Sequence, residues 1–455
     1  MYKIQFVGYE KTDQLLELVH TFLQPDQFQI VPTGTPADAE TMVFGRTAKG
    51  DRDAIKRELF AVLGQLTESR PDWGILTGIR PVKLAGQLVN RLGSREAARN
   101  ALLETYCLSP EKAELTLSIW DRQQRLAGNP TPNTFGLYVG IPFCPTRCLY
   151  CSFASNQESY EEVERYLPAL EQEITEVGAM ARRQGLRAES LYVGGGTPTT
   201  LTAEDLDRLL CALTDAFDLS ALREITVEGG RPDTLDREKL QVLKAHKVDR
   251  ISINPQTMKE ETLALIGRRH TTEDTRRAFA IAREVGGFSI NADLIAGLPE
   301  ETAAEFRHSL EEVLAMGADN VTVHALAVKR ASRLKEADPN YHYRQWHLVR
   351  QMTEEARAML AQNGFAPYYL YRQKHMAGAA ENIGYGLADA FGLYNVRIMD
   401  EHQSVLALGA GGISKVYYPA EDRLERVANV TNYREYVTRT NEMIQRKREH
   451  FFREV

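Results

Sequence analysis

The sequence predicts an α/β protein whose central part is an open, partial barrel of six β/α units, (β/α)6. Between residues 137 and 326, segments that favour strands alternate with segments that favour helices. This order is typical of a parallel sheet with right-handed crossovers. An unusual residue or motif lies at the end of each of the six strands, where barrels of this kind carry their chemistry, and six units are too few to close an eight-stranded barrel. One side is therefore expected to stay open for a large substrate.

Composition supports an ordinary globular chain of about three domains. The chain has 455 residues, of which 43% are hydrophobic and 26% charged, as in typical folded proteins. The net charge of −7 comes from interspersed acidic and basic residues, which argues against a large nucleic-acid-binding surface. The basic segment Arg446-Lys-Arg448 is expected to be the solvated face of a last helix.

The protein is expected in the cytoplasm, without a membrane span. No apolar run approaches the roughly 18 residues that cross a bilayer, and the start lacks a signal peptide's apolar centre. Three of the five cysteines lie close together, so they do not form a disulfide framework, and a reducing compartment suits them. Cys107 and Cys211 lie in helical patterns and are expected to be core residues.

Residues 1–128 are predicted to form an N-terminal α/β domain, to which the sequence assigns no function. The first six residues alternate as a strand. Arg80 and Lys83 lie in a loop that could meet an anion, although a plain turn is the alternative. Helices are expected at 52–68, 81–92, 94–106 and 110–127.

A proline-containing linker at 129–134 leads into the predicted barrel, residues 135–330. Its strands are expected at 137–141, 191–193, 224–228, 250–254, 289–294 and 321–326. Its helices are expected at 160–184, 203–216, 236–245, 259–285 and 301–316.

A loop directly after the first barrel strand carries Cys144, Cys148 and Cys151 in a C-x3-C-x2-C spacing. Clustered thiolates select zinc, copper(I) or an iron–sulfur cluster. A structural zinc site requires a fourth ligand, and the next histidine along the chain is His246. Three ligands on a four-iron cluster would leave one iron open for another molecule. A zinc knuckle that lacks one ligand and three incidental thiols remain the alternatives.

These residues resemble the cluster loop of radical S-adenosylmethionine (SAM) enzymes, which have an aromatic residue, here Tyr150, before the last cysteine. The flanking Tyr138 and Ile141-Pro-Phe143 resemble the oxygen-independent coproporphyrinogen III oxidases and their relatives, the HemN/HemW group. A later segment, Tyr368–Lys374, most resembles the coproporphyrinogen dehydrogenase branch called HemZ. Gly140 stands where the family usually has a histidine.

The resemblance implies a [4Fe–4S] cluster on the three cysteines and one or two molecules of SAM. Three successive glycines let a ligand approach the backbone, carboxylates and amides suit a ribose, and a guanidinium suits a carboxylate. Each polar residue taken alone could be an ordinary one. A second SAM would contact Gly196 and Thr197. The implied SAM-binding residues are Tyr138, Tyr150, Gly194, Gly195, Gly196, Thr197, Glu228, Gln256, Arg268, Asp293 and Ala327.

Residues 340–455 resemble the family's substrate-covering domain and are predicted to be mainly helical α+β. Arg372 and Lys374 could pair with substrate propionates, or could belong to an exposed loop. Tyr368, Tyr369 and Tyr371 could line a tetrapyrrole pocket or be ordinary strand residues.

The function implied by the resemblance is oxygen-independent decarboxylation of coproporphyrinogen III. A 5′-deoxyadenosyl radical would convert two propionates to vinyl groups and give protoporphyrinogen IX. A low-potential electron donor such as flavodoxin or ferredoxin would be the protein partner. The alternatives are a haem-binding chaperone of the same family and a radical SAM methyltransferase or ring-opening enzyme acting on haem.

Overall fold

The structure, a computed structural model, describes residues 1–453 apart from 10, 46–52, 79, 154, 330–331, 339 and 374–379. Its main feature is an eleven-stranded sheet whose middle six strands are parallel and lie in chain order. Their apolar residues are buried on both faces, as parallel sheets require. The six strands are β4 (Thr134–Ile141), β5 (Arg187–Gly195), β6 (Glu224–Glu228), β7 (Arg250–Ser252), β8 (Ser289–Ala296) and β9 (Asn320–Ala325).

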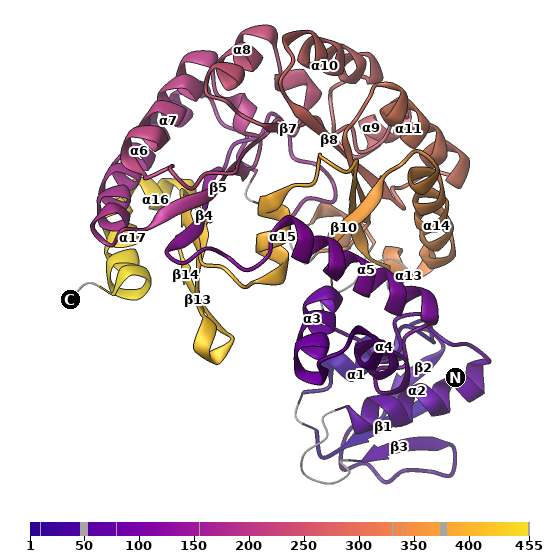
Figure 1. The fold of residues 1–455 in the computed structure, drawn as a ribbon. Helices are drawn as coiled ribbons and strands as arrows, with labels where there is room; N and C mark the ends of the chain where they lie inside the picture. The colour runs from indigo at the N-terminus through magenta and orange to yellow at the C-terminus, as the bar shows by residue number, and fades with distance from the viewer. Residues whose placement is uncertain are drawn as a thin grey trace.

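Helices between these strands form the outer layer of an arc (Figure 1). They are amphipathic, and threonine hydroxyls cap three of them: Thr202, Thr271 and Thr302 each accept a backbone N–H of the first turn. The helices are α6 (Tyr160–Arg183), α7 (Ala203–Ala216), α8 (Arg237–Ala245), α9 (Glu260–Leu265), α10 (Thr272–Val285) and α11 (Ala303–Ala315).

The continuous helix expected at 259–285 is wrong, because the chain leaves the helix after Leu265. Gly267 has φ +78°, a left-handed conformation that only glycine adopts without cost. Thr271 then caps a new helix. The break matters because it brings Arg268 out of the helical layer and into the site described below.

The C-terminal part of the chain extends both edges of the barrel sheet. On one edge, β11 (Asn382–Gly386) pairs antiparallel with β9, and β10 (Ala366–Tyr371) pairs with β11. On the other, β12 (Val405–Leu408) pairs parallel with β4 and leads to the hairpin β13 (Ile413–Tyr418) and β14 (Arg423–Ala428). Within the described chain, β10 and β14 end the sheet and do not pair with each other. The remaining helices are α12 (Arg333–Ala337), α13 (Tyr341–Arg344), α14 (Trp346–Gln362), α15 (Leu393–Asp400), α16 (Tyr433–Thr438) and α17 (Thr440–Lys447).

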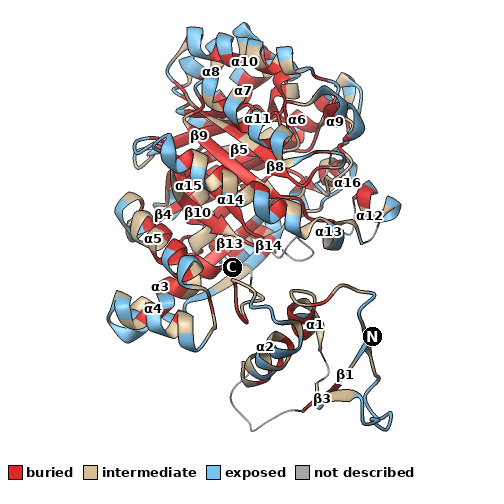
Figure 2. Ribbon diagram, turned by 90° about the vertical axis from the view of Figure 1, so that its right-hand side faces the viewer, coloured by how far each residue is buried: buried red, intermediate tan, exposed pale blue. Residues whose placement is uncertain are grey.

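The N-terminal part divides between two hydrophobic cores. A parallel sheet of β1 (Tyr2–Val7), β2 (Phe28–Ile30) and β3 (Thr41–Gly45) shares its own core with α1 (Asp13–Val19) and α2 (Ala54–Thr67). Residues of α3 (Pro81–Leu92), α4 (Arg95–Glu104) and α5 (Pro110–Leu126) belong to the core of the barrel. Figure 2 shows the first group standing apart from the large buried sheet.

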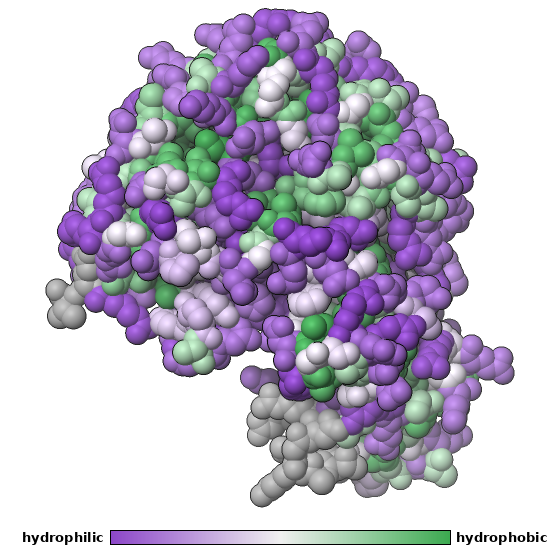
Figure 3. Space-filling model, viewed as in Figure 1, coloured by the Kyte–Doolittle hydropathy of each residue, from purple (hydrophilic) through white to green (hydrophobic). Residues whose placement is uncertain are grey.

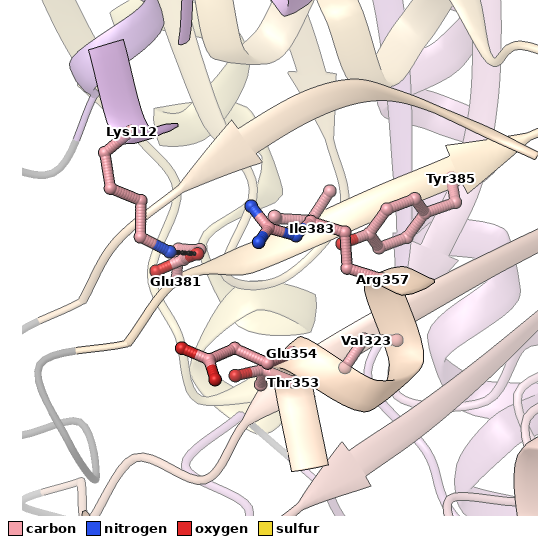
Figure 4. A pocket seen from close by; sticks show the side chains of 8 residues that line it. All are labelled: Lys112, Val323, Thr353, Glu354, Arg357, Glu381, Ile383 and Tyr385. Carbon is pink, nitrogen blue, oxygen red and sulfur yellow. Dashed lines mark hydrogen bonds and ion pairs between the residues drawn. The ribbon is translucent and has the colours of Figure 1, made fainter. Parts of the chain in front are cut away.

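Ion pairs join the N-terminal helices to the C-terminal part. Arg80 and Lys83 do meet an anion, and it is the Glu401 carboxylate of this chain. Lys112 of α5 pairs with Glu381, which also accepts a hydrogen bond of 2.8 Å from the Trp73 indole. Figure 4 shows this pair at one end of a small polar pocket between α5, α14 and the sheet.

Two expectations about single residues are wrong. Lys447 is not solvated: its side chain is fully buried and its Nζ lies 2.7 Å from a Glu173 oxygen. Cys211 is not in the core but exposed on α7, and Cys107 is half-buried. Lys447 is buried because Glu173, from a distant segment, pairs with it, whereas Cys211 is left at the surface of α7. Helical spacing alone reveals neither outcome.

The surface agrees with the helical patterns. Seen as in Figure 1, the outer rim of the arc is mostly hydrophilic, and hydrophobic side chains gather toward its inside (Figure 3). Among the described residues, no helix combines the length and apolar character that crossing a membrane demands.

Candidate active site

The carboxyl ends of the six parallel strands meet at one edge of the sheet and carry the predicted site residues. The cysteine loop (residues 142–152) follows β4, and the glycine cradle (Gly194–Gly196) lies at the end of β5. Glu228 ends β6, Asp293 lies in β8, and Ala327 follows β9 and is buried. These segments are far apart in sequence, and they lie together because their strands pair in parallel.

The cysteine loop is fixed by backbone hydrogen bonds to two other segments. The Cys144 N–H donates to Asn156 O at 3.0 Å, and Asn156 N–H returns a bond of 3.0 Å to Pro142 O. The Leu149 N–H donates to Ile266 O at 2.9 Å, at the break between α9 and α10. The Thr146 hydroxyl donates to Gly267 O at 2.7 Å. Hydrogen bonds to the chain between α9 and α10 therefore hold the cysteine loop in place.

The three cysteine sulfurs do not form a set of ligand atoms that all lie within 4.8 Å of one another. Zinc holds sulfur at about 2.3 Å, so the sulfurs of one zinc site lie within about 4.6 Å of each other. In the described part of the chain, the residues whose ligand atoms all approach within 4.8 Å are Asp207, Cys211 and His246, and the cysteine loop does not form such a set. A larger inorganic cluster bridges wider gaps between sulfurs, which favours a cluster over a zinc knuckle that lacks its fourth ligand.

The cysteine loop buries Cys148 and partly shields Cys144 and Cys151 from solvent. Burial raises the pKa of Cys144 to about 11, and burial also raises the pKa of Cys151. Such thiols stay protonated at neutral pH unless a metal replaces the proton. Reactivity as free thiols is therefore low, and metal ligation suits them better.

The glycine cradle lies directly beneath this loop and has no room for side chains. A Cβ on Gly196 would lie 2.5 Å from Phe143 O and 2.9 Å from Cys144 Sγ, and one on Gly194 would lie 2.6 Å from a Glu228 oxygen. Thr197 continues the cradle, with its N–H bonded to Phe143 O at 2.8 Å and its hydroxyl 3.5 Å from Cys144 Sγ. Close packing therefore favours glycine at 196, beside Cys144, and at 194, beside Glu228.

Gln256 is held in a strained conformation that points to a role. Its φ is +70°, which costs a non-glycine residue about 1–3 kcal/mol. Its N–H donates to Asp293 O at 2.9 Å, and its carbonyl accepts Ile295 N–H at 3.0 Å. The buried side-chain Oε1 has no partner within the described chain, although buried polar atoms usually have one.

Arg268 is a second buried group with an unused donor. Its Nη1 donates to Asn254 O at 2.5 Å, and the guanidinium interacts with Tyr150 and Cys148. Its Nε has no partner within the described chain. A ligand acceptor beside Arg268 would satisfy this donor, which is costly when left unpaired.

Two carboxylates inside the barrel have opposite pKa shifts. Enclosure by the protein raises the pKa of Glu228 to about 7, and the charge of Asp293 adds to the effect. Burial alone would also raise the pKa of Asp293, but His324 and Asn291 lower it below its ordinary value. At neutral pH, Asp293 is therefore the ionised acceptor, and Glu228 holds a proton more readily than Asp293 does.

His324 was not among the site residues predicted from the sequence. Its Nε2 lies 3.6 Å from an Asp293 oxygen, and its Nδ1 lies 3.3 Å from the Tyr371 hydroxyl. Along β9, polar residues at 320, 322 and 324 alternate with apolar ones, and the polar ones contact other residues of the barrel interior. This alternation was a signal in the sequence, since a fully buried parallel strand is normally apolar throughout.

Three tyrosine rings form a stack in the barrel. The ring centroids of Tyr192 and Tyr394 lie 4.5 Å apart, and Tyr138 lies 6.2 Å from Tyr192. Tyr394 comes from α15, far along the chain. The sequence analysis singled out Tyr138 but neither of its two partners.

Of the two residues predicted to bind substrate, the structure describes only Arg372. Arg372 is buried beside the N-terminal helices, with its Nη1 bonded to Leu76 O and its guanidinium 5.1 Å from the Trp73 ring. Burial lowers its pKa to about 10. This placement turns it away from Tyr371 and the barrel interior, and Lys374 lies outside the described residues. Their role as substrate ligands stays a prediction.

Gly140 lies next to the turn that follows β12. A Cβ there would lie 3.4 Å from Ala410 O, and the Gly140 carbonyl accepts the Tyr166 hydroxyl at 2.7 Å. A side chain at this position would therefore point toward the C-terminal turn.

The site residues fit an iron–sulfur cluster and a nucleotide cofactor. The three clustered sulfurs offer ligands for a cluster, and Gln256 and Arg268 offer unused polar atoms. A site of this kind belongs to radical SAM proteins, and the model of the Radical SAM superfamily matches residues 138–313. The family implies a [4Fe–4S] cluster and SAM.

Within this superfamily, the chain belongs to the oxygen-independent coproporphyrinogen III oxidase-like proteins. It is 41% identical over 371 residues to the "Oxygen-independent coproporphyrinogen-III oxidase-like protein HemZ" of Bacillus subtilis, which covers 80% of this chain and 74% of that one. The "Heme chaperone HemW" of the same organism is 37% identical over 42% of this chain and 50% of its own length. The recognition of the family from its motifs is confirmed.

A solved structure confirms the fold. Coproporphyrinogen III oxidase (HemN) from Escherichia coli matches with a TM-score of 0.54 and 23% identity, over 73% of each chain. The prediction of a partial radical SAM barrel is therefore confirmed, whereas the domain boundaries and the roles of single site residues stay predictions.

Proposed function

We propose that this protein is a radical SAM enzyme that decarboxylates propionate side chains of coproporphyrinogen III to vinyl groups without oxygen. The observation that carries the proposal is the convergence, at one sheet edge, of the cysteine loop, the glycine cradle and two buried unpartnered polar atoms. The relatives named for coproporphyrinogen oxidation support the substrate class.

Each part of the site has a distinct task. Cys144, Cys148 and Cys151 would hold the cluster, and the cradle with Thr197 would face the amino acid part of SAM. Asp293 and Gln256 would accept hydrogen bonds from the ribose hydroxyls. When bound, the cluster and SAM supply an electron and a 5′-deoxyadenosyl radical that can remove a hydrogen atom. The protein orients the groups and excludes water.

The substrate would lie in the barrel interior beyond this edge. The stacked Tyr138, Tyr192 and Tyr394 offer flat apolar faces, which suit a tetrapyrrole. His324 lies beside Asp293 and within reach of the Tyr371 hydroxyl, so it can donate a hydrogen bond to a carboxylate when protonated. We assign His324 a substrate-facing position.

A second candidate function is haem binding as a chaperone. The similarity to a protein named haem chaperone supports it, because that similarity extends over 42% of this chain. The cysteine motif is shared by both classes, so it does not discriminate between them. The greater coverage by the oxidase-like relative, 80% of this chain, favours the enzyme.

The test is an anaerobic assay with reconstituted protein, SAM, dithionite and coproporphyrinogen III. Vinyl products together with 5′-deoxyadenosine are the expected result. Stable haem binding without turnover would favour the chaperone, and a methylated or linear tetrapyrrole would favour the third alternative. Replacing dithionite by reduced flavodoxin or ferredoxin then tests the proposed donor. The chemistry needs a reducing compartment such as the cytoplasm.

A further inference from the structure

A second group of metal-ligating side chains lies on the outer helical layer, apart from the cysteine loop. Asp207 and Cys211 are four residues apart in α7, which places them one above the other on the same face. His246 directly follows α8, the neighbouring helix. The Asp207 and Cys211 side chains are exposed, whereas Leu206, Leu209, Leu210 and Leu213 of α7 face the barrel core.

The three side chains are already close together. The ligand atoms of Asp207, Cys211 and His246 all lie within 4.8 Å of one another, and His246 Nε2 is 2.7 Å from Asp207 Oδ1. Zinc bonds of about 2.0–2.3 Å to oxygen, nitrogen and sulfur need ligand atoms no more than about 4.3 Å apart. Small rotations of exposed side chains are enough to close the difference.

The donor types select the metal. A thiolate, an imidazole and a carboxylate together suit Zn²⁺, whereas Mg²⁺ and Ca²⁺ prefer oxygen ligands alone. We propose that Asp207, Cys211 and His246 form a zinc site that ties α7 to α8 and is independent of the cysteine loop. The zinc ion takes the place of the proton between Asp207 and His246, and the Cys211 thiol releases its proton on binding. Three protein ligands leave a fourth position to water.

The position of Cys211 supports this proposal. Free cysteine is among the most buried residue types, yet Cys211 is exposed in the structure. It lies one turn from a carboxylate that holds a histidine from another helix. A merely solvated surface explains the aspartate, but not a thiol and an imidazole that converge on it.

The test measures zinc binding to the anaerobic, cluster-loaded protein, in which the loop cysteines are occupied. A chromophoric chelator competes for zinc, iron content is followed in parallel, and the melting temperature is recorded with and without zinc. One zinc per chain is expected to bind without loss of iron. It should also raise the melting temperature, because a ligand of the folded state stabilises it.

Matched variants locate the site. Cys211→Ser and His246→Gln are expected to weaken zinc binding by about tenfold or more, since even outer-shell changes cost 10–100-fold. Cys107→Ser and Asp215→Asn remove another free thiol and another α7 carboxylate and should change nothing. The proposal is overturned if Cys211→Ser binds zinc as the parent does, or if zinc binds only as iron leaves.

A variant without the three loop cysteines tests the zinc site independently of the cluster. With Cys144, Cys148 and Cys151 all replaced by alanine, Co²⁺ should give a thiolate-to-cobalt absorption band that Cys211→Ser abolishes. A missing band in this background, with native circular dichroism retained, would also overturn the proposal.

Discussion

Among the residues that the structure describes, buried polar groups have partners in one region of the molecule and lack them in another. The first region is the C-terminal part of the chain around Glu173 (the flank), and the second is the site at the carboxyl ends of the barrel strands (the mouth). At the mouth, Gln256 Oε1 and Arg268 Nε have no partner within the described chain. In the flank, the buried Glu173 accepts hydrogen bonds from Lys447, Asn429, Tyr436 and the Gly409 N–H, all between 2.7 and 2.9 Å. A folded chain usually satisfies its buried polar groups. The comparison therefore marks Gln256 and Arg268 as candidates for ligand contacts, and Glu173 as the centre of a structural network.

Changing Cys148 to serine should have the largest effect, and on function only. We expect loss of the cluster's absorption and of SAM cleavage down to the level of protein-free controls, because a serine oxygen is a poor ligand for iron in such a cluster. Far-UV circular dichroism should stay native, since the loop is held by backbone bonds. Cys107→Ser is the matched control and should cleave SAM normally. Normal cleavage by Cys148→Ser would contradict the cluster assignment.

Changing Lys447 to methionine should affect stability and leave the site intact. It leaves the Glu173 charge unpaired in the core, which should lower the free energy of unfolding by about 3–5 kcal/mol. The loss is measured as a lower urea midpoint of unfolding. The double change Glu173→Gln with Lys447→Met should recover most of the loss. Arg446→Met, one residue away and half-exposed, should cost less than about 1 kcal/mol. Equal losses for Lys447→Met and Arg446→Met would show that the flank does not depend on this pair.

Changing Gln256 to glycine should have the smallest effect on stability. Relief of the positive φ, about 1 kcal/mol, is offset by a similar gain of entropy in the unfolded chain. SAM affinity should fall about tenfold, the equivalent of one hydrogen bond, as measured by equilibrium binding to the cluster-loaded protein. Gln256→Ala loses the same amide but keeps the strain, so it should bind equally weakly. If Gln256→Gly binds SAM as tightly as the parent protein, SAM is not the missing partner of the Gln256 side-chain oxygen.

Local sequence signals were sufficient for the barrel and for the cysteine loop. Each of the six predicted strands overlaps a strand of the structure, whereas the helix predicted at 259–285 is divided into α9 and α10. Lys447, Cys211 and His324 were misjudged or overlooked for one reason. Their surroundings depend on Glu173, on α8 and on Tyr371, which are distant in sequence, and a single chain without its contacts does not reveal such partners.

The end of β10 joins the N-terminal part of the chain to the barrel interior. Tyr371, the last residue of β10, lies with its hydroxyl 3.3 Å from His324 Nδ1, whereas the next residue, Arg372, contacts the Trp73 ring in the segment between α2 and α3. One step along the chain therefore separates the packing of the N-terminal segment from the side chains beside Asp293.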